Sequence, residues 1–175
     1  MRKIALFLTC CLFISCEQKE KIQKYIIVKE DTQTERKVDI VSSDEFNIDD
    51  VIEWNGRSYS YNLKKSVDKD LPIVKNNDGQ KFYDNQIEIN IKSDDGSTFY
   101  SHTFKKSSFE QYLPDSFIEN GIMEGLAYDK IDESGRIKFI ACIAYPQTDE
   151  YMLFSVLISK DKSITIGKDN RMMEQ

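Results

Sequence analysis

Beyond residue 48, apolar and polar residues alternate along many short segments of the chain. In QIEINIK, Ile87, Ile89 and Ile91 fall on one face of an extended segment, and the residues between them are polar. The same period of two runs through STFYSHTF. This pattern is typical of strands that bury one face, so it predicts a domain that is mainly β.

Short turn sequences separate these segments. Asn55-Gly56 is typical of a two-residue type I′ turn in the hairpin DVIEWNGRSYSYNL. RIKFIACIAY and YMLFSVLIS are apolar at nearly every position, which predicts central strands with both faces covered. We expect an antiparallel β-meander of about eight strands that closes as a barrel or folds as a sandwich.

One short helix is expected after the segment STFYSHTF. Ser107 and Glu110 have the spacing of a capping box, and Pro114 ends the run FEQYL. The sequence DSFIENG that follows is predicted to be irregular.

The first residues follow a different pattern. Arg2 and Lys3 precede an apolar run, Ile4–Ile14, and Ser15 stands before Cys16. A positive head, a short apolar run and a small residue describe a secretory signal, and the run is shorter than the roughly 20 residues of a membrane-spanning helix. The end of the run, FISC, resembles the lipobox of bacterial lipoproteins, which implies that Cys16 becomes the mature N-terminus and carries acyl chains such as palmitate. The alternative is an ordinary signal peptide with an incidental cysteine.

These patterns divide the chain into three parts. Residues 1–15 are predicted to be a lipoprotein signal peptide, residues 16–48 a polar tether, and residues 49–170 the β-rich domain. The tether is mostly charged and polar and lacks Gly and Pro. Its one apolar patch, Tyr25–Val28, suits an edge strand.

Charge excludes one class of partner. The chain has 24 Lys and Arg against 30 Asp and Glu, a net charge of −6. Cleavage before Cys16 would remove Arg2 and Lys3 and leave 22 basic against 30 acidic residues, or −8. A negative domain with scattered basic residues gains nothing from a phosphate backbone, so we expect no nucleic-acid partner. Because no basic amphipathic helix appears, membrane attachment is expected through lipid on Cys16 alone.

A family resemblance accompanies these features. DLPIV, KFYDNQIEI, GIMEGLAYDK and AYPQTDEY follow the lipobox in that order. Together they resemble lipoproteins of Bacteroidetes with domain of unknown function 4738, from about Val51 to Gly167. The resemblance implies a lipid-anchored protein of the cell envelope and supplies no catalytic residues. Surface export in that phylum goes with an acidic cluster after the lipidated cysteine, whereas Glu17–Lys21 alternates in sign, so the periplasmic face and the cell surface both remain open.

No catalytic, cofactor or metal-binding motif is recognisable in the sequence. His102 is the single histidine and has no nucleophile motif beside it. Cys142 is the one cysteine beyond the signal and Cys16, and we expect it to pack as a small apolar residue. SDDGS and DKIDES lack the spacing of a calcium loop or of a catalytic carboxylate pair, so both are expected to be solvated turns. We therefore expect no enzyme activity, no cofactor and no metal.

The stretch AYPQTDEY is the first candidate for partner contacts. Its proline interrupts the sheet between two apolar strands, and loops held by rigid strands commonly carry binding residues. The candidates are Tyr145, Asp149, Glu150 and Tyr151. The alternative is a plain turn in which Thr148 and Asp149 bond the backbone.

Aromatic residues supply the second candidate. Trp54, with Tyr59 and Tyr61, is a candidate sheet-face patch, because Trp and Tyr dominate interface hot spots. The alternative, which we favour, is that these rings fill the core or line a barrel.

Three classes of function follow. A lipid-anchored, non-catalytic binding or interaction module of the envelope, for an unknown protein or small ligand, is the leading hypothesis. A small acidic inhibitor or immunity-type lipoprotein is the second, because negative charge speeds the encounter with a basic target. A hydrolase is third, because no base, nucleophile and oxyanion group can be named.

Overall fold

The computed structural model describes residues 39–169. The chain divides into two compact units, residues 1–37 and 38–175, and the described residues belong to the second. The predicted signal peptide, Cys16 and the tether up to residue 38 therefore lie outside the described residues. None of the helices in the described part is long and apolar enough to cross a membrane.

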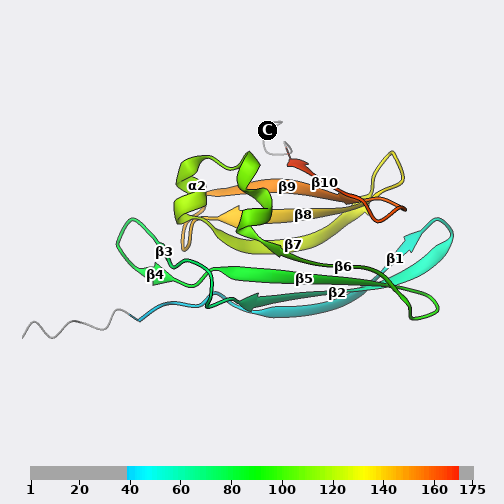
Figure 1. The fold of residues 1–175 in the computed structure, drawn as a ribbon, viewed down its shortest axis with the longest axis horizontal. Coiled ribbons are helices and arrows are strands. Elements are labelled where there is room, and N and C mark those ends of the chain that lie inside the picture. The colour runs from blue at the N-terminus through cyan, green and yellow to red at the C-terminus, as the bar shows by residue number, and fades with distance from the viewer. Residues whose placement is uncertain (1–38, 170–175) are drawn as a thin grey trace, which may run out of the picture. The chain divides into compact units, whose positions relative to one another are not determined.

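Two four-stranded antiparallel sheets form the body of this unit and face each other in two layers (Figure 1). The first sheet has the order β1-β2-β5-β6, with bounds Phe46–Trp54, Arg57–Val67, Asn85–Ser93 and Thr98–Lys105. The second has the order β10-β9-β8-β7, with bounds Ile164–Lys168, Tyr151–Ile158, Ile137–Ala144 and Ile122–Ile131. The sheets do not close into a barrel, so the arrangement is sandwich-like and the expected antiparallel meander is confirmed in each sheet.

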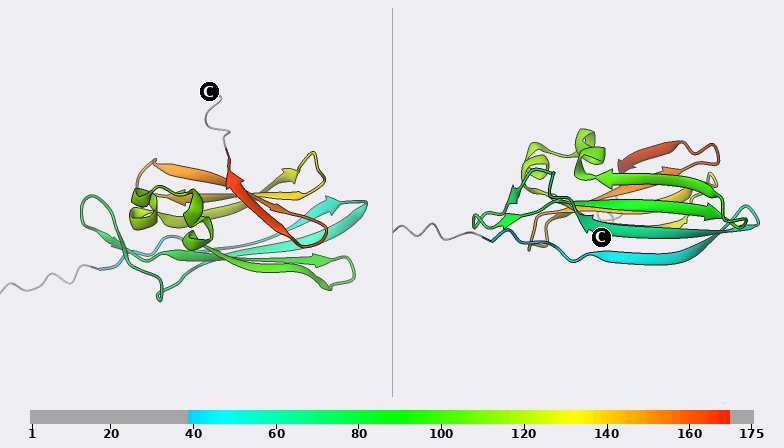
Figure 2. Two further views of the ribbon diagram at one scale, coloured as in Figure 1. Left: turned by 45° about the horizontal axis from the view of Figure 1, so that its top comes forward. Right: turned by 60° about the horizontal axis from the view of Figure 1, so that its bottom comes forward.

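Smaller elements lie at one end of the two sheets (Figure 2). A two-stranded hairpin, β3 and β4, has the bounds Val74–Lys75 and Lys81–Phe82. A 3₁₀ helix, η2 (Lys106–Tyr112), and an α-helix, α2 (Asp115–Asn120), connect the edge strand β6 of the first sheet to β7 of the second.

The alternating pattern places one row of apolar side chains of each strand between the sheets. Ile87, Ile89 and Ile91 of β5 are fully buried, as are Phe139 of β8 and Phe154 of β9. Burying a side chain of this size contributes about 1.5–3 kcal/mol. Because two such layers pack face to face, the core is continuous across both sheets.

The 3₁₀ helix closes the core at one edge. Phe109 of η2 is fully buried, with its ring centroid 5.2 Å from that of Phe154 and 6.0 Å from that of Phe104. The Tyr112 hydroxyl donates to the Ile166 carbonyl at 2.6 Å. This helix therefore joins the edges β6 and β10.

The first hairpin forms as predicted. Asn55 and Gly56 have φ values of 53° and 74°, and Trp54 pairs with Arg57. Positive φ at both central residues defines the type I′ turn, whose twist matches the flanking strands.

The helical region differs from the prediction in two ways. The first helix is a 3₁₀ helix that begins at Lys106, and the exposed Ser107 does not cap it; the Ser108 hydroxyl accepts instead from the Lys105 N–H at 3.2 Å. DSFIENG is not irregular, because it forms α2 directly after Pro114. Proline suits a helix start, where its missing N–H costs nothing.

Two further expectations need correction. The folded unit includes residues that the sequence assigned to the tether: β1 begins at Phe46, and Val41 forms a bridge with Phe82. β8 and β9 are central strands as predicted, but Ile140 and Leu153 on their outward side are only half-buried, so the prediction that both faces are covered is wrong for the described part. The strands are apolar outward as well as inward, beyond what burial requires.

Candidate functional site

Four polar side chains line up across the exposed face of the first sheet. Asp49 of β1 pairs with Asn62 of β2, Asn62 pairs with Asn90 of β5, and Asn90 pairs with Ser101 of β6. We call these four residues the polar row. Each strand alternates, so the row lies on the side opposite the core, and it crosses all four strands at right angles to them.

Hydrogen bonds within the sheet face fix the row. The Asn62 side-chain amide donates to Asp49 Oδ1 at 2.9 Å and to Asn47 Oδ1 at 2.8 Å. At the other end, the Ser101 hydroxyl donates to Asn90 Oδ1 at 2.6 Å. None of these bonds uses the Asn62 carbonyl oxygen or the Asn90 amide nitrogen.

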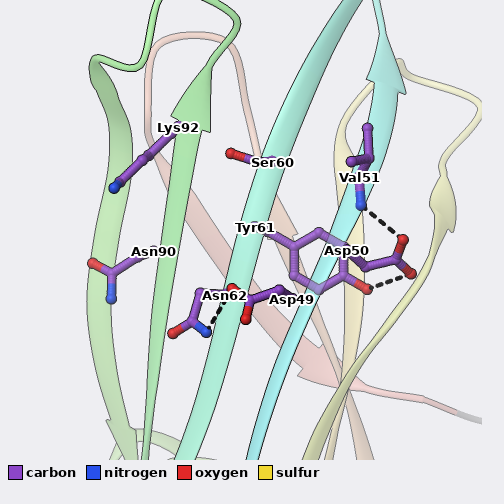
Figure 3. Close-up of a pocket in the computed structure, with 8 residues that line it drawn as sticks. All are labelled: Asp49, Asp50, Val51, Ser60, Tyr61, Asn62, Asn90 and Lys92. Atoms are coloured by element: carbon purple, nitrogen blue, oxygen red, sulfur yellow. Dashed lines mark hydrogen bonds between the residues drawn. The ribbon is translucent and has the colours of Figure 1, made fainter.

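An open hollow of about 740 Å³ lies over three of the four residues of the row, and Ser101 lies outside it. Its lining includes Asp49, Asn62 and Asn90 together with Ser60 and Lys92. Figure 3 shows the Asn62 amide beside Asp49, with Asn90 and Lys92 on the neighbouring strand. The volume is within the range of ligand pockets, although the lining is more polar than is usual for drug-like ligands.

Asp50 and Tyr61 form a further hydrogen bond next to the hollow, on the core-facing side of β1 and β2. The Tyr61 hydroxyl donates to Asp50 Oδ2 at 3.5 Å (Figure 3). Burial, and secondarily the nearby Asp50 charge, raises the pKa of Tyr61. The phenol therefore stays protonated at neutral pH and acts as a donor.

The residue types of the row conflict with the elements that carry them. Asn and Asp are depleted in strands, yet Asn62 and Asn90 occupy the two central strands of this sheet and Asp49 lies directly beside them. Residues that contradict local propensity without a packing role are expected at functional sites. Each is compatible with an ordinary outward-facing position, so only the register of the four strands reveals the row. For that reason the sequence alone does not predict the polar row.

A comparison with models of known protein families assigns this chain to a family. The family model described as Domain of unknown function (DUF4738) matches residues 26–166, which is most of the chain. The chain belongs to the DUF4738 family. No curated protein matches the chain.

A buried ion pair forms a second polar site in the DUF4738 domain. Asp84, 3% exposed, accepts from the backbone N–H groups of Asn85 and Met123, both at 2.8 Å. Its Oδ2 lies 3.7 Å from the Nζ of Lys106, which donates to the Gly121 carbonyl at 2.7 Å. Burial raises the pKa of Asp84 and lowers that of Lys106, so desolvation outweighs their mutual attraction. Asp84 thereby joins the start of β5 at Asn85 to Met123 of β7 and Lys106 of η2, which indicates a structural role.

A pocket of about 290 Å³ adjoins this pair, with mostly apolar walls that include Leu71, Val74 and Ile118. Its lining also includes Lys105, Ser107, Glu110 and Glu119, but most of its exposed wall is apolar, unlike that of the hollow over the polar row.

The predicted partner loop forms a hydrogen-bonded turn. The Tyr145 N–H donates to the Glu150 carbonyl at 2.9 Å, and the Thr148 hydroxyl donates to the Tyr145 carbonyl at 3.2 Å. The Tyr145 ring stacks on Phe117 with centroids 4.3 Å apart. Asp149, Glu150 and Tyr151 are exposed, so their proposed role as partner contacts stays a prediction.

Trp54 does not offer its ring to a partner. It is 3% exposed, its Nε1–H donates to the Gly135 carbonyl at 2.8 Å, and its ring packs edge-on against Tyr59 and Phe99. Tyr59 and Tyr61 are buried as well. These aromatic residues therefore belong to the core, as the favoured interpretation predicted. Trp54 has almost no exposed ring surface with which to contact a partner.

The remaining candidate groups take structural positions. His102 lies on the edge strand β6 with its ring beside Tyr100 and Phe104, and burial lowers its pKa. SDDGS forms a hairpin turn, and Asp132 of DKIDES accepts from the Ser134 and Arg136 N–H groups. Within residues 39–169, no group of three or more His, Cys, Asp or Glu side chains is placed to hold a metal ion.

Proposed function

We propose that this DUF4738 chain is a lipid-anchored protein of the bacterial cell envelope that binds a ligand on the polar row without catalysis. The sequence supports the anchor, through the lipobox-like FISC and the polar stretch after Cys16. The same features support membership among the Bacteroidetes lipoproteins that carry this domain. Acylation at Cys16 would provide the membrane affinity, because stable anchoring needs more than one acyl chain.

The polar row is the observation that carries the binding role. It combines a hollow, outward hydrogen-bonding groups held in place by neighbours, and residue types that the strands themselves disfavour. Rigid, pre-ordered groups lose little entropy on binding, so a site built on strands favours recognition.

Two experiments test this proposal. Membrane fractionation tests the anchor: Cys16→Ala should move the protein from the membrane to the soluble fraction, and a variant that stays membrane-bound would contradict lipidation.

Photocrosslinking in intact cells tests the binding surface. A photoreactive amino acid at Lys92, which lines the hollow, should give adducts with an envelope component. The matched control is the same amino acid at Ala127, an exposed position on β7 of the other sheet. Equal adducts at both positions, or none at Lys92, would contradict a binding site at the polar row.

A further inference from the structure

We propose that the ligand of the polar row is a neutral, hydroxyl-rich chain, the chemistry of an uncharged oligosaccharide. This inference rests on the proposed function of the row as a binding surface. It follows from the hydrogen-bonding groups that the row leaves available, from their spacing and from the local charge.

The internal bonds of the row determine what it presents. All three hydrogen bonds of the Asn62 side chain, to Asn47, Ile48 and Asp49, use its amide nitrogen, so its carbonyl oxygen remains as an acceptor. Asn90 is the reverse: its carbonyl accepts from Ser101, so its amide nitrogen remains as a donor. Asp49 and the Ser101 oxygen add acceptors at the two ends.

This sequence of groups matches hydroxyls better than it matches ions. A hydroxyl both donates and accepts, so a row of hydroxyls can bond acceptors and the donor alike. An anion could bond only the Asn90 amide and Lys92, while Asp49 would repel it. A cation would face the outward amide of Asn90. Mixed donors and acceptors therefore select a ligand with mixed donors and acceptors.

Charge supports a neutral ligand. On the face of the row, the lining of the hollow has one carboxylate, Asp49, and one ammonium group, Lys92, whereas Asp50 pairs with the core residue Tyr61 on the opposite face. The whole chain has a net charge of −6. Such a field lowers the local concentration of anionic polymers, including phosphate-rich ones, and leaves an uncharged chain unaffected.

The length of the row suits an oligosaccharide and exceeds a single sugar. Neighbouring strands lie about 4.8 Å apart, so the three steps from Asp49 to Ser101 span roughly 14 Å. One strand spacing is close to the length of one sugar ring. A glycan lying across the strands would therefore place successive rings over successive residues of the row.

The test is an NMR titration of the mature chain from residue 16, ¹⁵N-labelled and carrying Cys16→Ala so that it stays in solution. The probes are maltohexaose, cellohexaose and N-acetylchitohexaose, with the neutral polysaccharide fraction of the envelope as a fourth. The side-chain NH₂ resonances of Asn62 and Asn90 report directly from the row. We expect them to shift with at least one probe.

Two double variants make the test specific. Asn62→Ala/Asn90→Ala should weaken binding by about tenfold or more, because the variant loses the hydrogen bonds that both side chains would make to the ligand. Lys64→Ala/Glu88→Ala is the matched control, because this pair lies beside the row on the same two strands and outside the hollow, and its net charge change is zero. Its binding should equal that of the unmodified chain.

The outcomes separate the two proposals. If no sugar probe shifts the two resonances but the peptide fraction of the envelope does, the oligosaccharide assignment is wrong while the binding function of the row stands. If neither the sugar probes nor the peptide fraction shifts the two resonances, both the oligosaccharide assignment and the binding function of the row are wrong. If sugars bind equally well to Asn62→Ala/Asn90→Ala, the site lies elsewhere and the inference fails.

Discussion

The substitution Asp84→Ala should destabilise the domain more than the same substitution at an aspartate in an exposed turn. The Asp84 carboxylate accepts from two backbone N–H groups, those of Asn85 and Met123, and is 3% exposed. In Asp84→Ala both donors lose their acceptor at a position where the native side chain is almost fully buried. Each buried donor left without a partner costs about 1–3 kcal/mol, so the pair costs about 2–6 kcal/mol.

Part of this cost is offset. Burial raises the pKa of Asp84, which means that the ionised carboxylate is itself unfavourable there, and alanine removes that penalty. We therefore expect a net loss of about 2–3 kcal/mol in the free energy of unfolding. That is a large share of the roughly 5–15 kcal/mol typical of a domain.

Urea denaturation at neutral pH measures this loss, with Asp161→Ala as the control. Asp161 also accepts a backbone N–H, that of Ser163 at 3.0 Å, but it is exposed in a turn. Water can replace its bond, so its loss should stay within about 0.5–1 kcal/mol. Equal losses for the two variants, with unchanged m-values, would refute the argument that burial makes Asp84 critical.

Three further predictions concern pH, reactivity and the exposed loop. Burial raises the folded-state pKa of Asp84 above its ordinary 3.8, so its stabilising contribution is full below that value and is lost as pH rises through the folded-state pKa. The stability of the unmodified chain minus that of Asp84→Asn should therefore fall as pH rises above 3.8, and a rise would show that Lys106 dominates instead. Burial, reinforced by the charge of Glu124, raises the pKa of the Cys142 thiol to about 11. A thiol reagent at pH 8 should therefore label Cys142 slowly in the native chain and quickly once urea unfolds it. Fast labelling of the native chain would contradict this prediction. Asp149→Ala/Glu150→Ala should change the unfolding free energy by no more than about 0.5 kcal/mol while reducing capture of any partner of the loop; a larger loss, or unchanged capture, would make the loop purely structural.

The strands and their turns could be predicted from sequence because their signals are local. The isoleucines of β5 alternate with polar residues, and Asn55-Gly56 specifies its turn through backbone conformation alone. The central place of β8 and β9 also followed from their apolar composition. In each case the information lies within a few neighbouring residues.

Other features depend on tertiary contacts. DSFIENG has no strong helix signal, yet α2 forms there, and Gly121 directly after it approaches Ile143 so closely that a Cβ would lie 3.0 Å from its side chain. The early start of the fold depends on Val41 meeting Phe82, a pairing that no local pattern announces.

The candidate site was the least predictable part. Asn62 and Asn90 are separated by a whole hairpin in the sequence, and they become neighbours only through the pairing of β2 with β5. The loop residues Asp149 and Glu150 were visible in the sequence because they cluster locally. A binding surface assembled across strands requires the register, which sequence patterns do not supply.

A binding assay with isolated envelopes tests the claim that the polar row binds an envelope ligand. Soluble mature chain carrying Cys16→Ala is mixed with purified envelopes, and the bound fraction is measured by sedimentation. We expect this chain and its Lys64→Ala/Glu88→Ala variant to bind equally, and Asn62→Ala/Asn90→Ala to bind at least about tenfold more weakly. Equal binding by all three proteins, each shown to be folded by its urea transition, would contradict the claim.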